Sequence, residues 1–217
     1  MRMSVLNIDV AKLKKQYIYI FLKRLIDVIA SIAGLIILSP LFLVVALCIK
    51  IDDPRGPIFY SQIRVGKSGR KFRMFKFRSM VTNADQLLKE LEEKNEIDGA
   101  MFKLKSDPRI TKVGRIIRKY SLDELPQLVN VVTGSMSLVG PRPPLVHEVE
   151  KYSDYDKQRL LVKPGCTGLW QVGGRNDVDF DEMVKLDLNY ITHRSTFLDI
   201  KIMFETVWVM VKPNGAY

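Results

Sequence analysis

The chain has 217 residues, of which 47% are hydrophobic and 27% charged, and its formal net charge at pH 7 is +10. This length accommodates one domain with a core, or one domain plus a membrane anchor, and the apolar content excludes a disordered protein. The basic excess indicates an anionic partner: nucleic acid, an anionic lipid surface or a phosphorylated substrate. Cys48 and Cys166 form no spacing motif, which fits a reduced, cytosol-facing protein.

Residues 25–49 form an apolar run whose only charge is Asp27, and the run is long enough to cross a bilayer as a helix. Ser39 and Pro40 lie near its middle. Pro40 cannot donate to the carbonyl of Ile36, and Ser39 can bond a carbonyl freed in this way. Three shapes therefore fit the run: a spanning helix, kinked at the proline or not; a buried core helix; or a helix–break–helix that enters one leaflet and returns.

Basic residues flank this run on both sides, whereas a spanning helix should have one basic, cytoplasmic flank. We therefore favour the re-entrant hairpin, with both ends in the cytoplasm. The chain then divides into a basic N-terminal segment (1–22), a re-entrant membrane helix (23–50) and a cytoplasmic, membrane-associated remainder (51–217). The flanking cations are Lys14, Lys15, Lys23 and Arg24 before the run, and Lys50, Arg55, Arg64, Lys67 and Arg70 after it.

A β-hairpin is predicted next. Residues 58–60 and 71–78 indicate short strands around a turn at 66–69. Strand alternation places Lys76 and Arg78 on one face, and Phe75 and Phe77 on the other. Two neighbouring cations can clamp an anion, although the same pattern is typical of a solvated strand face.

Four helical patterns follow. Asn83 begins an acidic amphipathic surface helix. Residues 110–120 form a basic amphipathic pattern, which suits either an anionic membrane surface or a core-packed helix. Asp179 is expected to cap a helix over 180–192, and Ser195 a helix over 196–211. The last helix is interfacial or core-packed, with Trp208 as a candidate interface anchor.

Ser121-Leu122-Asp123-Glu124 allows two interpretations. Ser-x-x-Glu is the pattern of a helix capping box, and Pro126 suits a helix's first turn. Adjacent carboxylates at a helix start, after several cations, also suit phosphoryl chemistry: one attacks phosphorus, and either or both hold Mg²⁺.

Two loops complete the pattern. Prolines at 141, 143 and 144 stiffen the chain around Arg142, whose planar guanidinium suits phosphate oxygens, although a rigid linker would look the same. Residues 164–168 and 173–175 are glycine-rich turns around Trp170. They suit a nucleotide cradle or simple tight turns, and neither has Walker or dinucleotide-fold spacing.

Together these segments resemble the bacterial sugar transferase family, the monotopic phosphoglycosyl transferases that act on polyprenyl phosphate. The resemblance covers Phe21 to Tyr217, and the order of its motifs is more specific than any one of them. One small departure is Ser79, where threonine is more usual. The motifs are Lys23–Asp27, Leu38–Pro40, Gly56–Phe59, Gln62–Gly66, Lys76–Met80, Asp107–Arg109, Ser121–Gln127 and Ser137–Pro143.

The resemblance implies an α+β, mostly helical fold: a re-entrant membrane helix hairpin, interfacial amphipathic helices and a small β-hairpin or sheet. It implies that Asp123 and Glu124 are the catalytic pair and bind Mg²⁺, with Asp123 as the nucleophile that forms a phosphosugar–enzyme intermediate. The expected substrate-binding residues are Lys76, Arg78, Arg118, Gln127 and Arg142. The expected membrane-segment residues are Lys23, Arg24, Ser39 and Pro40.

The implied reaction moves hexose-1-phosphate from a UDP-sugar to undecaprenyl phosphate, releases UMP and begins capsule, exopolysaccharide or other glycan synthesis. The helix at Leu198-Asp199 and the final Gly215–Tyr217 point to UDP-glucose or UDP-galactose. The implied location is the cytoplasmic face of the bacterial inner membrane, in contact with its lipid, and a homo-oligomer remains open. Long members carry extra N-terminal transmembrane helices and a further domain, and the sequence shows only the catalytic module.

Two other functions compete with this one. A non-catalytic basic membrane-surface adaptor would use the cations and the anchor but not Asp123. A nucleic-acid binder is disfavoured by the membrane segment and by the lack of a recognisable nucleic-acid motif, so no nucleic-acid partner is expected.

Overall fold

The structure is a computed structural model that describes residues 8–84, 86–87, 104, 107–173 and 179–211. Three sequence predictions lie wholly or mostly outside these ranges: the acidic helix from Asn83, the glycine-rich turn at 173–175 and the C-terminal Gly215–Tyr217.

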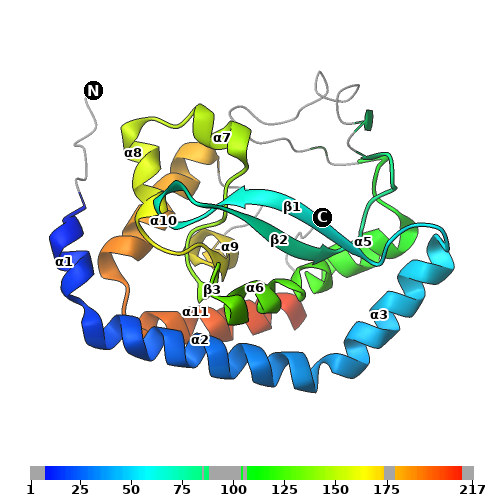
Figure 1. The fold of residues 1–217 in the computed structure, drawn as a ribbon, viewed down its shortest axis with the longest axis horizontal. Helices are drawn as coiled ribbons and strands as arrows, with labels where there is room; N and C mark the ends of the chain where they lie inside the picture. The colour runs from blue at the N-terminus through cyan, green and yellow to red at the C-terminus, as the bar shows by residue number, and fades with distance from the viewer. Residues whose placement is uncertain (1–7, 85, 88–103, 105–106, 174–178, 212–217) are drawn as a thin grey trace.

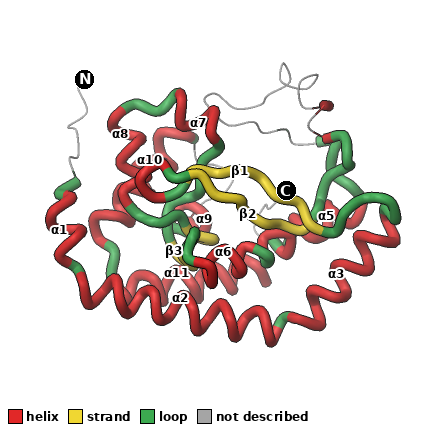
Figure 2. Tube along the Cα trace, in the orientation of Figure 1, coloured by secondary structure: helices red, strands yellow, loops and turns green. Residues whose placement is uncertain are grey.

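Helices dominate the described residues, and two small two-stranded sheets lie among them, as expected for a mostly helical α+β protein (Figure 1, Figure 2). The N-terminal half contains α1 (Val10–Lys15), α2 (Tyr17–Ile37), α3 (Ser39–Asp52), β1 (Phe59–Val65), η1 (Lys67–Gly69), β2 (Lys71–Phe77), α5 (Lys112–Lys119) and η3 (Leu122–Glu124). The rest contains α6 (Gln127–Thr133), β3 (Ser137–Val139), α7 (Val146–Glu150), α8 (Asp154–Lys157), η4 (Gln158–Leu161), β4 (Gly165–Thr167), α9 (Leu169–Gly173), α10 (Phe180–His193) and α11 (Thr196–Val211).

The apolar run forms α2 and α3, which meet at a bend of 60°. Pro40 lies in the first turn of α3, and Ser39 Oγ donates a 2.8 Å hydrogen bond to the carbonyl of Ile36. This is the carbonyl that the proline leaves without its helical partner, so the predicted break is confirmed. No single described helix is long and apolar enough to cross a membrane. Taken together, the bent pair α2 and α3 has the length and the apolar composition that a crossing would need.

One side of α2 packs on the rest of the protein, and the other side is apolar and exposed. The buried carboxylate of Asp27 accepts hydrogen bonds from Ser137 Oγ at 3.1 Å and from the backbone N–H of Leu138 at 3.0 Å. The only charge in the run is therefore used to join α2 to β3. The exposed large side chains of α2 recur every three or four residues, which defines one helix face: Ile18, Phe21, Leu25, Ile29, Ile32 and Ile36.

Two other helices extend this exposed apolar surface. α3 continues from α2 beyond the bend, and α11 contacts α2 and runs beside it along the lower edge of Figure 1. We call the combined surface the apolar face: the six α2 residues above with Leu43, Val44, Leu47 and Ile51 of α3, and Phe197, Phe204, Val207, Trp208 and Val211 of α11.

Three buried clusters hold the elements together. The largest joins α10 and α11 to β3, through residues such as Val139, Leu188 and Ile202. Another joins α3, β2 and α5, with Phe77 and Ile117 at its centre. The third packs β2 on α6, through Leu138, Met74, Val131 and Met136 among others.

The hairpin is confirmed, and its first strand is longer than expected. β1 pairs antiparallel with β2 from Phe59↔Phe77 to Val65↔Lys71, around the predicted turn. The polar residues at 61, 62 and 64 interrupt the apolar pattern from which a strand is predicted. The strand forms nevertheless, because it pairs with β2 along its whole length.

The prediction of a glycine-rich turn at 164–168 is wrong, because Gly165–Thr167 forms β4, which pairs in parallel with β3. The glycine at 165 is needed for this pairing. A Cβ there would lie 2.1 Å from the backbone nitrogen of Gly140.

The predicted helix caps near the C-terminus are confirmed. Asp179 Oδ1 accepts from the backbone N–H of Glu182 at 2.7 Å, and Ser195 Oγ accepts from that of Leu198 at 3.2 Å. The basic helix forms as α5, and its core packing is confirmed, because Ile117 is buried against α3. Ile116 is 60% exposed, and the membrane-surface setting stays a prediction.

Candidate active site

Asp123 and Glu124 lie on η3, the 3-10 turn between α5 and α6. Ser121 precedes the turn with φ 54°, a left-handed conformation, whereas the first residue of a capping box is extended. Its side chain makes no cap hydrogen bond. The capping-box interpretation is therefore wrong, and helix capping does not explain the two carboxylates.

Lys76 of β2 reaches both acids. Its Nζ lies 2.5 Å from Glu124 Oε1 and 4.0 Å from Asp123 Oδ2. The side chain of Asp123 is 10% exposed and that of Glu124 is 36% exposed. The neighbouring acids therefore differ, since Asp123 is a buried carboxylate and Glu124 is a more accessible one held by a lysine.

The environment raises the pKa of Asp123 to about 6. Burial is the main cause, and the negative charge of Glu124 acts in the same direction. The positive charges of Lys76 and Arg118 oppose it. Asp123 therefore loses its proton close to neutral pH, with two cations stabilising the ionised form.

The same two carboxylates are the best metal ligands near this turn. Mg²⁺ commonly takes one or two carboxylates and completes its shell with water and substrate phosphates. Within the described residues there is no group of three or more His, Cys, Asp or Glu side chains that could hold a metal ion. Asp123 and Glu124 fit a Mg²⁺ that is bound together with a phosphorylated substrate, with Lys76 as the competing cation.

Arg78 does not form an anion clamp with Lys76, and that prediction is corrected. The Arg78 side chain is buried and pairs with the carboxylate of Asp53, just after α3. Its hydrogen bond is the main reason that the pKa of Asp53 is lowered. A Cβ at Gly56 would lie 2.0 Å from Arg78 Nη1, so the glycine makes room for this pair. Arg78 therefore joins the hairpin to the end of α3.

Arg118 and Gln127 lie on either side of the acidic turn. Arg118, near the end of α5, lowers the pKa of both Asp107 and Asp123, which places its charge near the turn. Gln127 begins α6 and is only 2% exposed, and its Oε1 makes no hydrogen bond in the part of the chain that the structure describes. The charge of Arg118 is thus placed near Asp123, and Gln127 lies at the start of the helix that follows the acidic turn.

The loop that carries Arg142 is fixed by its carbonyl groups. Four consecutive carbonyls, from Pro141 to Pro144, accept hydrogen bonds from the rest of the fold. Prolines at three of the four positions restrict φ as well. In order, the donors are the N–H of Gly165 (2.9 Å), Arg159 Nη2 (3.5 Å), Arg64 Nη1 (3.0 Å) and the N–H of Val65 (2.9 Å).

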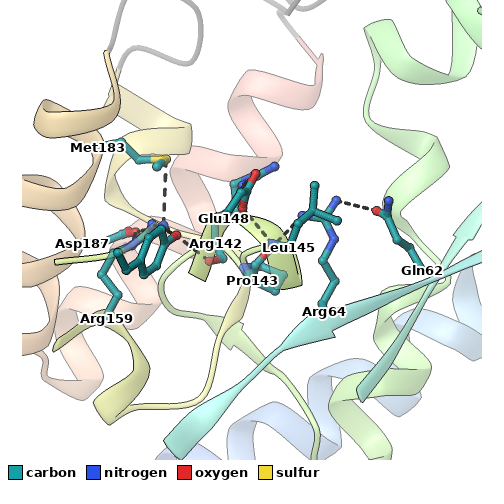
Figure 3. Close-up of polar contacts among 10 residues, drawn as sticks. Gln62, Arg64, Arg142, Pro143, Leu145, Glu148, Arg159, Met183 and Asp187 are labelled. Atoms are coloured by element: carbon teal, nitrogen blue, oxygen red, sulfur yellow. Dashed lines mark hydrogen bonds and ion pairs between the residues drawn. The ribbon is translucent and has the colours of Figure 1, made fainter. Parts of the chain in front are cut away.

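Glu148 of α7 holds the Arg142 side chain. Its two carboxylate oxygens accept from Arg142 Nη1 at 3.3 and 3.2 Å, and one of them also accepts from the N–H of Leu145 at 2.7 Å. Burial lowers the pKa of Arg64 to about 10; the charge of Arg142 acts in the same direction, and the charges of Glu148 and Glu124 oppose it. Arg64 therefore lies between the arginine loop and the acidic turn, and Figure 3 shows it beside that loop.

Behind the loop is a buried ion pair between η4 and α10 (Figure 3). Arg159 and Asp187 have side chains 0% and 1% exposed, with nitrogen and oxygen 2.7 Å apart. Arg159 also donates to Tyr152 Oη at 2.7 Å, so most of its donors are used inside the protein. This arginine supports the loop rather than facing a ligand.

Comparison with known proteins identifies the family. The sequence pattern of the bacterial sugar transferases matches residues 18–213, which is nearly the whole chain.

The chain belongs to the bacterial sugar transferase family.

Named relatives cover most of this sugar transferase chain. It is 50% identical over 202 residues to the galactosyl transferase CpsE of Streptococcus agalactiae, covering 93% of this chain and 44% of CpsE. It is 51% identical over 201 residues to the undecaprenyl-phosphate galactose phosphotransferase of Salmonella typhimurium, covering 91% and 42%. The chain thus spans less than half the length of these two relatives. It matches 88% of the exopolysaccharide production protein ExoY of Sinorhizobium fredii, at 44% identity.

The sugar transferase fold gives Lys23 and Arg24 partners inside the protein. Lys23 Nζ pairs with Asp199 of α11 at 2.9 Å. Arg24 donates to the carbonyls of Val131 and Val132 at 2.6 and 2.8 Å, which caps the C-terminal end of α6. Both residues were interpreted as a basic flank of the membrane segment, and in the structure they fix α2 to the rest of the fold.

Sequence reasoning did not single out Glu148, Arg159 or Asp187, and it gave Arg64 no role beyond a basic flank and a place in the Gln62–Gly66 motif. Glu148 carries a local signal, since an acid three residues after Leu145 can bond the chain at the start of a helix. The other contacts join segments far apart in the sequence, and no local spacing could have revealed them.

Proposed function

We propose that this chain transfers hexose-1-phosphate from a UDP-sugar to undecaprenyl phosphate, in capsule, exopolysaccharide or other glycan synthesis. The observation that carries the proposal is the buried Asp123, with Glu124 beside it and Lys76 between the two carboxylates. The names of two relatives support the proposed substrates. One is a UDP-galactose–lipid carrier transferase, and the other is an undecaprenyl-phosphate glucose phosphotransferase.

In the first step an Asp123 carboxylate oxygen attacks the phosphorus that carries the sugar. The new oxygen–phosphorus bond forms as the diphosphate bridge breaks, and UMP leaves with the bonding electron pair. Asp123 must be ionised, so the raised pKa keeps a neutral, inactive fraction at acidic pH. Lys76 stabilises the ionised carboxylate before attack.

In the second step an oxygen of undecaprenyl phosphate attacks the phosphorus of the phosphoaspartate. The bond between that phosphorus and Asp123 breaks, which regenerates the carboxylate and releases the sugar diphosphate lipid. Because the acceptor is a phosphate monoanion or dianion, no base is needed to activate it. Glu124 and Lys76 remain beside the reacting phosphorus throughout.

Asp123 and Glu124 would hold Mg²⁺. When bound, the ion neutralises charge on the diphosphate and on the leaving UMP.

Four residues would bind the donor. Arg142 presents its guanidinium from a loop whose carbonyls are all held in place, and the donor phosphate would compete with Glu148 for it. Gln127 offers a buried acceptor oxygen without a partner among the described residues, which suits a sugar or ribose hydroxyl. Lys76 and Arg118 supply positive charge at the acidic turn.

We further propose that α2 and α3 enter the cytoplasmic leaflet of the inner membrane and return. The apolar face gives the area of contact with acyl chains, and the 60° bend gives the change of direction. The lipid phosphate of the acceptor would then lie at the membrane surface, where a water-soluble UDP-sugar can reach it.

Two variants test the proposal. Asp123→Asn should abolish both UMP release from UDP-sugars and transfer of radiolabelled sugar to an organic phase, and no phosphosugar adduct should form on the protein. Glu124→Gln should be severely impaired but still able to form the adduct slowly. Arg115→Gln, an exposed charge change on α5, is the control. Near-wild-type turnover of Asp123→Asn would refute the role of Asp123 as the nucleophile. If the wild-type protein is inactive with every UDP-sugar tested, the non-catalytic adaptor is favoured.

A further inference from the structure

A second basic site lies at the other end of α6 from the acidic turn. A cavity of ≈ 760 Å³ opens between α1, the first turns of α2, η1 and the segment at 161–163. Six cations line it: Lys14, Lys23, Arg24, Lys67, Lys163 and Arg194. Lys23 pairs with Asp199 and Arg194 bonds Gln16. Ser137 and Asp27 also contribute to the wall, beside the cluster of Arg24, Lys67 and Lys163. Neither the proposed transfer chemistry nor the family comparison uses these lysines.

Lys163 is the central residue. It is half-buried, and its Nζ makes no hydrogen bond or ion pair with any described residue. A Cβ at Gly134 would lie 3.4 Å from Arg24 Nη2 and 3.6 Å from Lys163 Nζ, so the two cations approach one point. Burial first, and then the charges of Arg24 and Lys67, lower the pKa of Lys163.

Protein groups do not neutralise this cluster. Arg24 binds neutral carbonyls, and the carboxylate of Asp27 is used by Ser137 and Leu138. Asp27 lies too far from Lys163 to form an ion pair, although its charge is felt there. Arg24, Lys67 and Lys163 repel one another, and a bound anion removes the repulsion.

The cavity also has an apolar side. Val10, Tyr17 and Ile20 line it and are 42%, 73% and 43% exposed. Tyr17 and Ile20 belong to α2, whose exposed side chains continue into the apolar face. A ligand that fills the cavity therefore meets both cations and exposed apolar side chains. This combination suits an anionic lipid better than a free phosphate ion.

The reacting acceptor lipid does not fit here. Arg24 caps the C-terminal end of α6, whereas Asp123 precedes its N-terminal end. The seven residues of α6 rise by roughly 10 Å, at about 1.5 Å per residue, so a phosphate at Lys163 is too far from Asp123 to react.

We propose that this cavity binds one anionic phospholipid, with its phosphodiester at Lys163, Arg24 and Lys67 and its acyl chains along α2. The site rests on the proposed membrane location of α2 and does not depend on the transfer chemistry. The bound lipid would fix the start of α2 at the surface of the leaflet.

Native mass spectrometry of the delipidated full-length chain in detergent tests the site, with added phosphatidylglycerol as the probe. The double variant Lys67→Gln/Lys163→Gln should bind it about 30-fold more weakly, which is about fivefold for each cation removed. Lys163→Arg should retain binding. The matched control is Lys151→Gln/Lys185→Gln, which removes two exposed lysines elsewhere and should leave affinity unchanged.

Three outcomes would overturn the proposal. Equal phosphatidylglycerol binding by the double variant and the control would show that the cavity is not the site. Displacement of the lipid by equimolar inorganic phosphate would indicate a free-anion site. Tighter binding of undecaprenyl phosphate, lost in the double variant, would assign the cavity to the acceptor. Because binding is measured without a donor, an inactive enzyme that still binds phosphatidylglycerol at this site would refute only the transfer chemistry.

Discussion

At the scale of single residues, Asp123 combines two opposed requirements. Burial would protect the proposed phosphoaspartate from water, but it also favours the neutral carboxyl group, which could not make the proposed attack on phosphorus. Lys76 offsets part of this cost, since its charge lowers the pKa that burial raises. The position of Lys76 between Asp123 and Glu124 therefore matters as much as its charge.

The first prediction concerns pH. Wild-type kcat/KM should rise through about pH 6 as Asp123 ionises. Lys76→Met should raise the pKa of Asp123 by about one unit, or about 1.4 kcal/mol, so the loss of activity should be about fivefold larger at pH 6 than at pH 8. Lys71→Met, an exposed change on the same strand, is the control. Losses of equal size at both pH values would contradict the electrostatic role.

The same pKa has a consequence for stability. The folded-state pKa of Asp123 lies above its unfolded value of 3.8, so the folded protein holds this proton more tightly. The resulting contribution to the free energy of unfolding is full below about pH 3.8 and is lost as the pH rises through about 6. Ionised Asp123 is thus tolerated for catalysis and is not a stabilising feature.

The second prediction concerns the shape of Arg142. Arg142→Lys keeps the charge but loses the planar fork, so kcat/KM should fall by about 10- to 100-fold, from the loss of about 1.5–3 kcal/mol of charged hydrogen bonding. Steady-state kinetics with UDP-sugar measures this, and Arg70→Lys is the exposed control. Unchanged kinetics of Arg142→Lys would show that Arg142 does not bind the donor.

At the scale of elements, the hairpin and α10 act as supports for loops. β1 binds the arginine loop through Arg64 and Val65, and β2 supplies Lys76 to the acidic turn. The Arg159–Asp187 pair joins η4 to α10 behind the same loop. The two reactive loops are therefore positioned by the same hairpin.

The third prediction concerns this buried pair. Arg159→Met leaves Asp187 buried without its cation and should lower the free energy of unfolding by about 3–5 kcal/mol. The double variant Arg159→Met/Asp187→Leu should recover much of the loss, because no buried charge remains. Denaturant unfolding followed by circular dichroism compares them. Arg159→Met stability within 1 kcal/mol of wild type would show that the pair is not a structural support.

At the scale of the whole molecule, exposed apolar side chains gather on α2, α3 and α11, whereas the carboxylates of the acidic turn interact with the cations Lys76 and Arg118. Soluble proteins rarely expose apolar patches of this extent. The distribution favours a protein with one side in lipid and its reactive groups at the water boundary.

The fourth prediction is topological. In a Cys48→Ala/Cys166→Ala background, Val5→Cys should be shielded from a membrane-impermeant thiol reagent in intact cells and labelled only after lysis, because a re-entrant helix keeps residues 1–16 in the cytoplasm. Labelling of intact cells would show a spanning helix. Adding Ser39→Ala/Pro40→Leu should restore a continuous helix and favour spanning. If topology and activity both survive that change, the break is not what turns the chain.

The sequence by itself determined the features that depend on local chemistry. The break at Ser39-Pro40, the hairpin turn, and the caps at Asp179 and Ser195 all follow from residues within a few positions of each other. The family motifs added the order of these segments, and the family match over residues 18–213 agrees with them.

Only the tertiary structure decided which partner each charged side chain binds. Lys76 and Arg78 look equivalent on one strand, yet one reaches Glu124 and the other is buried against Asp53. Lys23 and Arg24 look like a membrane flank, yet they bind α11 and α6. Gly165 looks like a turn residue, yet it lies in a strand that packs closely against Gly140. Each outcome depends on partners at least 20 residues away, and only the folded chain brings those partners within reach of one another.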